Sequence, residues 1–345
     1  MQPQPEAQPL PPIRFGLNEL TGAFGDIGTF APVYLGLVAV CGLPPGRTLV
    51  LFGAVYAGAA LFFRLPMPVQ PLKAMAAIAI AGRLPASTLA AAGLWIGAVL
   101  SLLAVAGRVD WLGRWFTRPI VKGIQCGVGL ILVLSGLRLV FSRHAVPAAG
   151  AAPNAFSLPS AADLKTALLL LVIPQLPLTL GNAVYAVSDV ARDYFGAGAR
   201  RATPRNLALS LGISNLLIGA AGGLPVCHGS GGMTAHYGFG ARSAGATLAM
   251  GLLLIALGAA LPDHAYRFIG MIPSWLLGAM LVYPGVCHVL LVRGLEERLP
   301  LALAMGLIGA VSGNLAWTLA FGLAAQWVLD RAAARRPAPS RGQRA

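Results

Sequence analysis

Long apolar segments, interrupted by short loops that carry most of the charged residues, decide what this chain can fold into. Of its 345 residues, 57% are apolar and only 10% are charged. A soluble globular protein has about 25% charged residues, so the surface of this chain cannot face water on all sides. A helix needs about 20 apolar residues to cross a bilayer. The sequence therefore predicts an all-α polytopic membrane protein whose main surrounding partner is the lipid bilayer.

About 12 apolar segments, with a range of about 10–12, lie between charged residues and Pro- or Gly-rich stretches. Five of them precede a Pro- and Ala-rich linker, and seven follow it. The five lie at about 17–40, 47–64, 70–82, 86–107 and 119–140, and the seven at about 163–194, 205–221, 229–240, 243–261, 273–292, 298–313 and 315–331.

Two of these segments are too short to span a bilayer as helices. Residues 70–82 follow a Pro-rich stretch that begins at Leu65, and residues 229–240 follow the stretch from Gly222 to His228. Proline and the residue before it favour extended backbone, so each short segment is predicted to be a strand followed by a half-helix. Non-helical backbone at membrane depth is tolerated only where it lines a cavity or is buried in protein.

The net charge of +14 is distributed unevenly between the two sides of the predicted membrane. With the N-terminus placed inside, cytoplasmic loops and tails hold about 17 of the 25 Lys and Arg residues, and the opposite side holds about six. This bias predicts cytoplasmic N- and C-termini for a multi-pass protein of the inner (plasma) membrane. Residues 1–16 are then a disordered cytoplasmic tail, 142–162 an extracytoplasmic linker and 332–345 a basic cytoplasmic tail. The basic residues are spread thinly between apolar segments, so nucleic acid is not expected as a partner.

Short similarities at nearly constant offsets indicate that residues 17–141 and 163–331 are two copies of one repeat. Five segments precede the second copy, and five is odd, so the two copies are predicted to be inverted in the membrane. Corresponding short segments interrupted by Pro and Gly indicate the binding site of a transporter. The matched positions are Leu65-Pro66 with Leu224-Pro225, Glu19 with Gln175, and Asp26 with Asn182.

Two half-helix N-termini aimed at one point would form an anion site. A helix N-terminus has free N–H groups and a positive dipole end, and glycines let its backbone approach a ligand closely. Neutral hydroxyl and amide donors can add hydrogen bonds to the four oxygens of a tetrahedral dianion. The candidate substrate-binding residues are Gln70, Pro71, Leu72, Lys73, Gln175, Asn182, His228, Gly229, Ser230, Gly231 and Gly232.

Two of these residues have a second interpretation. Lys73 lies in the first turn of a helix, where the dipole disfavours a cation unless an anion is bound; alternatively, its side chain extends to the membrane interface. His228 either contacts the ligand and changes protonation near neutral pH, or is a packed histidine bonded to a backbone carbonyl. The remaining histidines have no partner spacing and are expected to be structural: His144, His236, His264 and His288.

Glu19 and Asp26 are seven residues apart, which places them on one face of the first segment. Acids inside a membrane are energetically unfavourable and are functional-site hypotheses by default, so both are candidates for proton coupling, with Asp26 the deeper of the two. Their repeat counterparts are neutral amides, which predicts an acidic coupling side and a neutral ligand side. The sequence holds no carboxylate pair, Ser/His/Asp order, nucleotide loop or metal-ligand spacing, so neither catalysis nor a cofactor is expected.

Four stretches resemble motifs of the molybdate transporter family, a branch of the sulfate-permease-like superfamily. They are residues 18–30, 66–74, 174–182 and 223–232, the last continuing to 239–242. The resemblance runs from about residue 15 to about residue 330. It implies a core domain and a gate domain, with the substrate held between two half-helices. Superfamily relatives usually have seven segments per repeat, whereas the first half of this chain has about five.

The motifs and the resemblance together predict secondary-active transport of a tetrahedral oxyanion, coupled to protons and driven by relative movement of core and gate. The choice of molybdate rests on the resemblance, because molybdate and sulfate are both tetrahedral dianions. A sulfate transporter of the same fold, a permease for nucleobases or carboxylates, and an anion channel or receptor remain alternatives. Contacts between gate domains, which the resemblance also implies, leave a homodimer open.

Overall fold

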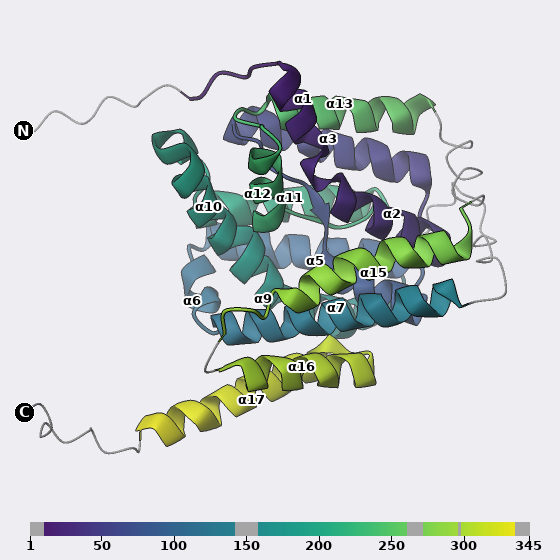
Figure 1. Cartoon of the computed structure of the whole chain (residues 1–345), viewed down its shortest axis with the longest axis vertical. Helices are drawn as coiled ribbons and strands as arrows, with labels where there is room; N and C mark the ends of the chain where they lie inside the picture. The colour runs from purple at the N-terminus through teal and green to yellow at the C-terminus, as the bar shows by residue number, and fades with distance from the viewer. Residues whose placement is uncertain (1–9, 142–157, 261–271, 296–297, 335–345) are drawn as a thin grey trace, which may run out of the picture.

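The computed structural model of this chain describes residues 10–141, 158–260, 272–295 and 298–334 (Figure 1). Residues 1–9 and 335–345 of the predicted tails, and residues 142–157 of the predicted linker, lie outside the described part. The backbone N–H of Arg14 donates to Oγ of Ser243 at 3.1 Å, so the chain is attached to a distant loop just before the first helix begins.

Five helical stretches of the described chain are long and apolar enough to cross a membrane, as a multi-pass membrane protein requires. Two of the five are composite. The first joins α1 (Leu17–Ala23), η1 (Phe24–Asp26) and α2 (Ile27–Cys41), and another runs from Ala161 to Ala199. The other three are α3 (Pro45–Phe63), α5 (Ala86–Val105) and α7 (Arg118–Val140).

The shorter described elements include the two predicted half-helices, each preceded by a two-residue strand. The strands are β1 (Gln70–Pro71) and β2 (Val226–Cys227), and the half-helices are α4 (Lys73–Gly82) and α12 (Ser230–Gly238). The other helices are α6 (Val109–Gly113), α11 (Pro204–Ala220), α13 (Gly245–Ala260), α15 (Ser274–Leu290), α16 (Leu299–Ser312) and α17 (Leu315–Ala334).

The two strands pair with each other and bring both half-helices to the interior. β1 and β2 are antiparallel, with Gln70 opposite Cys227 and Pro71 opposite Val226. The side chain of Asn215 on α11 satisfies the other edge of β2, donating to the carbonyl of Val226 and accepting from its N–H, both at 2.8 Å. These bonds satisfy the buried polar backbone that a strand exposes at membrane depth.

Close helix pairs surround this crossing, and glycines allow their approach. α3 packs against α13, α5 against α11, and α7 against α15. A Cβ atom on Gly53 of α3 would lie 2.5 Å from the carbonyl oxygen of Gly251 on α13. A Cβ atom on Gly129 of α7 would lie 2.5 Å from the carbonyl oxygen of Gly285 on α15. Small residues drive such contacts between membrane helices because lipid tails supply no hydrophobic force between helices.

The stretch Ala161–Ala199 is wound unevenly along its length. It contains α8 (Ala161–Thr166), the π-helical η2 (Ala167–Val172), α9 (Ile173–Leu178), the π-helical η3 (Thr179–Tyr185), α10 (Ala186–Phe195) and the 3₁₀ turn η4 (Gly196–Ala199). Pro174 and Pro177 have no backbone N–H and interrupt the regular ladder, and the wide π turns lie on either side of them.

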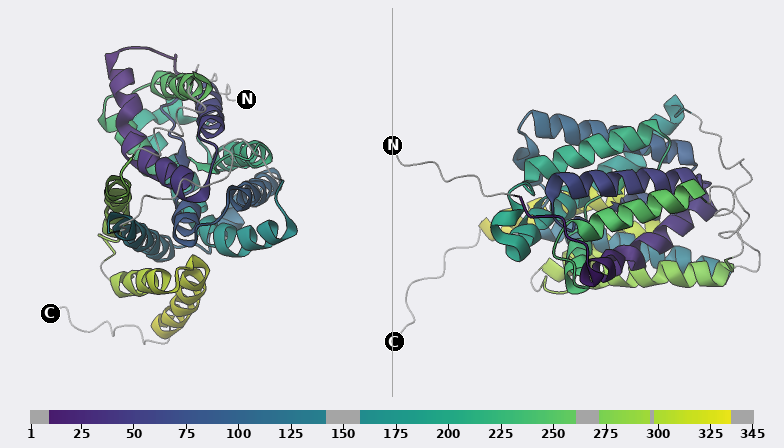
Figure 2. Two further views of the ribbon diagram at one scale, coloured as in Figure 1. Left: turned by 90° about the vertical axis from the view of Figure 1, so that its right-hand side faces the viewer. Right: turned by 90° about the horizontal axis from the view of Figure 1, so that it is seen from above.

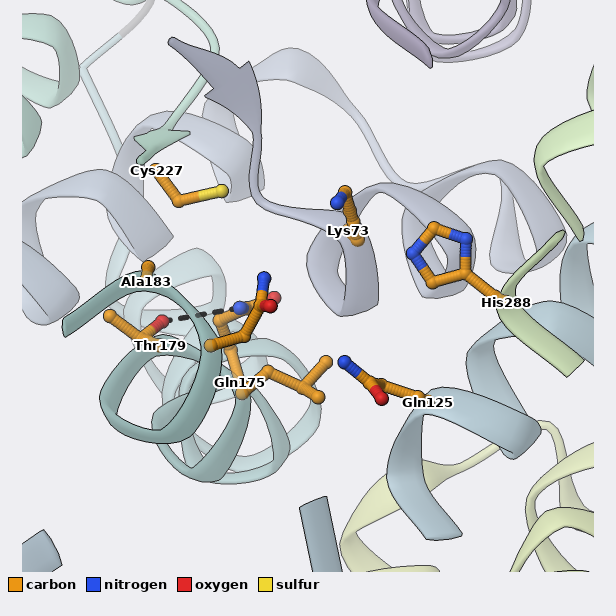
Figure 3. Close-up of a pocket in the computed structure, with 9 residues that line it drawn as sticks. Lys73, Gln125, Gln175, Thr179, Ala183, Cys227 and His288 are labelled. Carbon is orange, nitrogen blue, oxygen red and sulfur yellow. Dashed lines mark hydrogen bonds between the residues drawn. The ribbon is translucent and has the colours of Figure 1, made fainter. Parts of the chain in front are cut away.

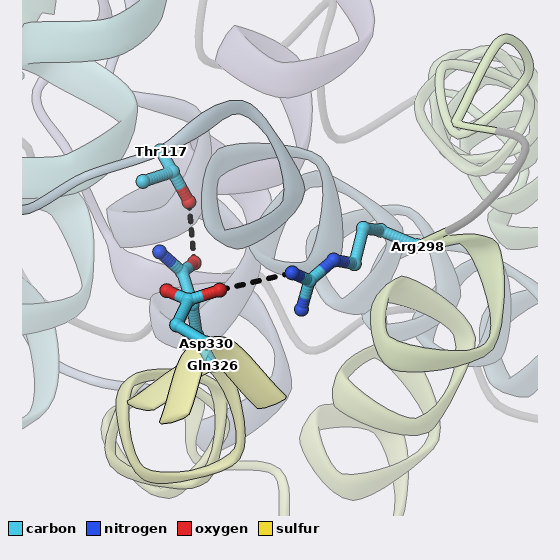
Figure 4. Close-up of polar contacts among 4 residues, drawn as sticks. All are labelled: Thr117, Arg298, Gln326 and Asp330. Carbon is cyan, nitrogen blue, oxygen red and sulfur yellow. Dashed lines mark hydrogen bonds and ion pairs between the residues drawn. The ribbon is translucent and has the colours of Figure 1, made fainter. Parts of the chain in front are cut away.

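Helices α16 and α17 lie at one edge of the molecule, against α7 (Figures 1 and 2). Two polar contacts connect α17 to the start of α7 and to the start of α16 (Figure 4). Thr117 donates to the side-chain oxygen of Gln326, and Arg298 forms an ion pair with Asp330 at 2.9 Å. The edge therefore has hydrogen bonds of its own in addition to apolar packing.

Candidate functional site

A small cavity lies beside the N-terminus of α4, where α9 and η3 approach α7 and α15 (Figure 3). Its free volume is about 10 Å³, which is room for about one water molecule. A ligand of the size of a tetrahedral oxyanion would fit here only if lining groups moved apart. The lining residues are Lys73, Gln125, Gln175, Leu178, Thr179, Asn182, Ala183, Cys227 and His288.

Lys73 is the one charged residue of this lining. It is the first residue of α4, at the positive end of the helix dipole, which disfavours a cation. Among the described residues, no carboxylate lies within ion-pair distance of its ammonium group, and the ion pairs found there are Arg192–Asp189 and Arg298–Asp330. The cavity therefore contains a positive charge and a positive dipole end without a directly paired carboxylate among the described residues; the buried carboxylate of Asp26, which does not line the cavity, interacts with Lys73 only at longer range.

The predicted site residue Gln175 binds directly to the first half-helix. Its side-chain oxygen accepts the backbone N–H groups of Ala74 at 3.0 Å and Met75 at 3.2 Å, and its nitrogen donates to Oγ1 of Thr179 (Figure 3). The sequence led us to expect an amide that donates to an anion. In this conformation, Gln175 instead presents its oxygen to the helix N-terminus.

The second half-helix is held in a similar way. Ser230, the first residue of α12, donates its hydroxyl to the side-chain oxygen of Asn182 at 2.7 Å. Asn182 lines the cavity, so α12 is connected to it through this bond. A Cβ atom on Gly231 would meet nothing within 4 Å, so the first turn of α12 is open beside this glycine.

Gln70 and Asp26 form a buried pair next to the cavity lining. The Gln70 amide nitrogen donates to Oδ1 of Asp26, and the residues are 1% and 3% exposed. Gly229, just before α12, and Gly232 within α12 lie directly against Gln70. The second oxygen of Asp26 has no hydrogen-bond partner among the described residues. This pair joins the first segment, β1 and α12, and neither residue lines the cavity.

The structure places four other predicted residues in supporting positions outside the lining. Pro71 is part of the strand pair, and Leu72 donates its N–H to the carbonyl of Pro225 at 3.0 Å. His228 is fully buried, with Nδ1 2.9 Å from the Pro68 carbonyl and Nε2 3.1 Å from Oγ of Ser210. Glu19 accepts the backbone N–H of Arg242 at 3.0 Å and so connects α1 to the loop before α13.

Sequence reasoning missed four polar or sulfur-containing lining residues: Gln125, Thr179, Cys227 and His288. His288 was expected to be only structural, yet it lines the cavity while Nδ1 lies 2.8 Å from the Pro284 carbonyl. Gln125 is 5% exposed, and its side-chain oxygen has no partner in the described chain. Both are polar residues within long apolar helices, a signal that could have identified them from the sequence.

A larger cavity of about 340 Å³ lies at the opposite end of α4. Its lining is mostly apolar, and Arg138 is its charged residue. Helices α4 and α16 both end at this cavity, and their C-terminal carbonyls disfavour an anion. The smaller cavity, with a helix N-terminus and Lys73, is therefore the better candidate for an anion site.

The helices of the described chain form a fold that solved structures of membrane transporters share. The transmembrane domain of a cyanobacterium bicarbonate transporter, BicA, gives a TM-score of 0.57 at 16% identity, covering 85% of this chain and 97% of that one. The murine Solute Carrier 26 family member A9 anion transporter, in its inward-facing state, gives a TM-score of 0.59 at 12% identity, covering 92% and 69%. At these identities the likeness is one of fold.

The sequence identifies the particular family. The family described as "Molybdate transporter of MFS superfamily" matches residues 18–132 and 167–287, so this chain belongs to the molybdate transporter family, as its motifs predicted. Molybdate transporter 2 of Arabidopsis thaliana is 27% identical over 361 residues, covering 78% of this chain and 77% of the relative. Molybdate transporter 1 of Chlamydomonas reinhardtii is 24% identical over 453 residues, covering 86% and 87%.

Proposed function

We propose that this protein is a secondary-active transporter of tetrahedral oxyanions, with molybdate as its main substrate, bound between the N-termini of α4 and α12. The observation that carries the proposal is Lys73, a cation beside the cavity with no carboxylate of the described residues in ion-pair distance. A dianion supplies the missing charge, and its oxygens accept from the helix ends and from neutral donors. Membership of the molybdate transporter family supports the choice of substrate.

Residues 17–141 and 163–331 act as two inverted repeats in this proposal, within a protein of about 12 segments of the sulfate-permease-like type. The helix contacts support it, because several pairings between the copies recur with the two copies exchanged. α3 of the first copy packs on α13 of the second, and α11 of the second packs on α5 of the first. Likewise, α2 contacts α15, and α9 contacts α7.

The cavity lies where we place the boundary between a core and a gate. The core contains both half-helices and the stretch Ala161–Ala199, and the gate contains α7, α15, α16 and α17. Gln125 and His288 reach the cavity from the gate helices, and Lys73 and Gln175 reach it from the core. Movement of one body against the other would open the cavity, and gate surfaces are available for a homodimer. The N- and C-termini are placed in the cytoplasm and the protein in the plasma membrane.

Uptake of labelled molybdate by purified protein in proteoliposomes tests the proposal directly. Saturable accumulation against a gradient is expected, and it would exclude an anion channel or a non-transporting receptor. Competition by sulfate and tungstate at two pH values then ranks the oxyanions. Purified protein that binds none of these three anions contradicts the proposed function. A nucleobase or carboxylate permease is less well supported, because the acid that such a site would use, Asp26, does not line the cavity.

Asp26 is proposed as the proton-coupling residue, because it is buried and one of its oxygens lacks a partner in the described chain. Glu19, the second candidate, is engaged by the backbone N–H of Arg242. Asp26→Asn should retain molybdate binding within about threefold but lose accumulation driven by a proton gradient. Binding and gradient-driven uptake are measured on the same preparation, with Glu19→Gln as the comparison. Loss of binding in Asp26→Asn would instead make this residue part of the ligand site.

Ser230 is expected to donate its hydroxyl to the bound oxyanion. Ser230→Ala should weaken molybdate binding by about tenfold, because a hydrogen bond to a charged acceptor contributes about 1.5–3 kcal/mol, part of which the freed Asn182 amide offsets. The control is Ser87→Ala on α5, which removes a comparable hydroxyl bond, to Asp163 at 3.1 Å, away from the cavity. Isothermal titration of both variants measures the difference, and equal affinities would remove Ser230 from the site.

A further inference from the structure

Two side-chain amides from a single helical stretch engage donors on both half-helices. Gln175 offers its oxygen to two N–H groups of α4, and Asn182 offers its oxygen to the Ser230 hydroxyl of α12. The two residues are seven positions apart, in α9 and in the π-helical η3. One stretch of chain therefore places an acceptor oxygen at each of the two helix ends that are proposed to face the anion.

The donors at these ends need an acceptor even when no substrate is bound. The N–H groups in the first turn of a helix have no partner within the helix, and leaving a buried donor unpaired costs about 1–3 kcal/mol. Water cannot meet this need at every donor, because the cavity has room for about one molecule. The oxygens of Gln175 and Asn182 meet it without adding a negative charge.

Two further features of the cavity would suit a bound anion. The ammonium group of Lys73 has no carboxylate of the described residues in ion-pair distance. Gln125 is 5% exposed, its oxygen has no partner in the described chain, and its nitrogen points toward the cavity (Figure 3). The amide oxygens thus satisfy hydrogen-bond donors but leave Lys73 without a direct ion-pair partner among the described residues, because Asp26 interacts with it only at longer range.

We infer that Gln175 and Asn182 are internal substitutes for the oxyanion. Until the oxyanion binds, their amide oxygens accept the hydrogen bonds that its oxygens would otherwise accept. This inference rests on the proposed function and reverses the role expected for the two amides, from ligands of the anion to its competitors. Substrate binding is then an exchange, in which the anion displaces the amide oxygens. Only an acceptor stronger than a neutral amide succeeds, which favours dianionic oxyanions over weakly basic monovalent anions.

The exchange also affects how the substrate-free transporter returns to the side of the membrane at which it binds its next anion. When the amide oxygens accept from the N–H groups of the helix ends, the core can move without substrate, because no unpaired N–H group has to cross the low-dielectric interior. Removing the amide oxygen of Gln175 should strengthen anion binding and slow the return of the substrate-free core. A direct ligand has the opposite effect on affinity, since its removal weakens binding. Affinity and the ratio of net uptake to exchange therefore distinguish the two roles.

The test compares molybdate binding and transport by the full-length protein and by Gln175→Met, which keeps the side-chain volume but has no amide oxygen. We expect Gln175→Met to bind molybdate about tenfold more tightly, because the anion pairs two N–H groups that are otherwise unpaired. Net uptake into empty vesicles should fall at least fivefold, while exchange of internal for external molybdate is retained. The matched control is Gln326→Met on α17, whose amide oxygen accepts from Thr117 outside the cavity.

A second variant, Gln175→Glu, keeps the inference testable if Gln175→Met fails to fold. A carboxylate on the α4 amides is a stronger substitute, so this variant should be folded, at least as resistant to heat as the wild type, and about 100-fold weaker in molybdate binding. Weaker or unchanged binding in Gln175→Met, or wild-type binding in Gln175→Glu, overturns the inference while the proposed function stands. Absence of molybdate, tungstate and sulfate binding by the wild type overturns both.

Discussion

Lys73→Gln is expected to weaken molybdate binding by about 100-fold or more and to abolish measurable uptake. The ammonium group is the one charged group in the cavity lining, and it has no carboxylate of the described residues with which to pair. Removing one partner of a buried ion pair costs about 3–5 kcal/mol, and every 1.4 kcal/mol corresponds to a tenfold change in affinity. The empty protein loses no ion pair among the described residues, so its fold should tolerate the change.

Lys122→Gln is the matched control for this prediction. Lys122 is a second lysine within the predicted apolar segments; it lies on α7, is partly buried and does not line the cavity. This variant should bind and transport molybdate within about twofold of the wild type. Equal losses in both variants would mean that the positive charge of the membrane domain, rather than Lys73 at the helix end, attracts the anion. Equilibrium binding at two salt concentrations separates the two explanations. Salt weakens attraction by exposed charges more than it weakens a buried pair between Lys73 and the anion.

Gly232→Ala is expected to abolish transport and to destabilise the protein by about 1–3 kcal/mol. A Cβ atom at this position would lie 2.6 Å from the side-chain nitrogen of Gln70, 2.7 Å from Cβ of Pro68 and 3.0 Å from Oδ2 of Asp26. Gln70 and Pro68 are fixed by the strand region before α4, so neither can move without shifting the first half-helix. The added methyl group would separate the two half-helices and break the hydrogen bond between Gln70 and Asp26.

The control for this variant lies on the same half-helix. A Cβ atom on Gly238 of α12 would meet nothing within 4 Å, so Gly238→Ala should retain stability and uptake. Thermal unfolding of purified protein and uptake in proteoliposomes measure both effects. A Gly232→Ala variant with wild-type stability and uptake would mean that the close contact between the half-helices is not required. Loss of uptake in both variants would point to a general sensitivity of α12.

The parts of this structure that follow from local chemistry could be predicted from the sequence. The proline-rich stretches before residues 70–82 and 229–240 set extended backbone, and short helices follow them in the structure. The family could also be predicted, because its motifs lie in these same stretches. The count of membrane segments, the repeats and the gate domain stay predictions.

The candidate site was only partly predictable, because its geometry depends on residues far apart in the sequence. Lys73, Gln175 and Asn182 were identified and do line one cavity, whereas Gln70 and His228 bond to other parts of the protein. Gln125 and His288 stand out in the sequence only as polar residues within apolar segments, which does not place them beside Lys73. Their proximity results from the packing of α7 and α15 beside α4, not from any spacing along the chain.

The sequence by itself determined that this chain belongs in a membrane, that two helices start within its interior, and which family it is part of. Apolar length, proline dihedral preference and motif identity are local properties, so they can be read without a fold. Only the tertiary structure decided which way the side-chain amides face. The orientation of Gln175 toward α4 and of Asn182 toward Ser230 arises from π turns and from the crossing of two strands. Such contacts decide which donors stay free for an anion. They join residues far apart in the sequence, so no local pattern of residues predicts them.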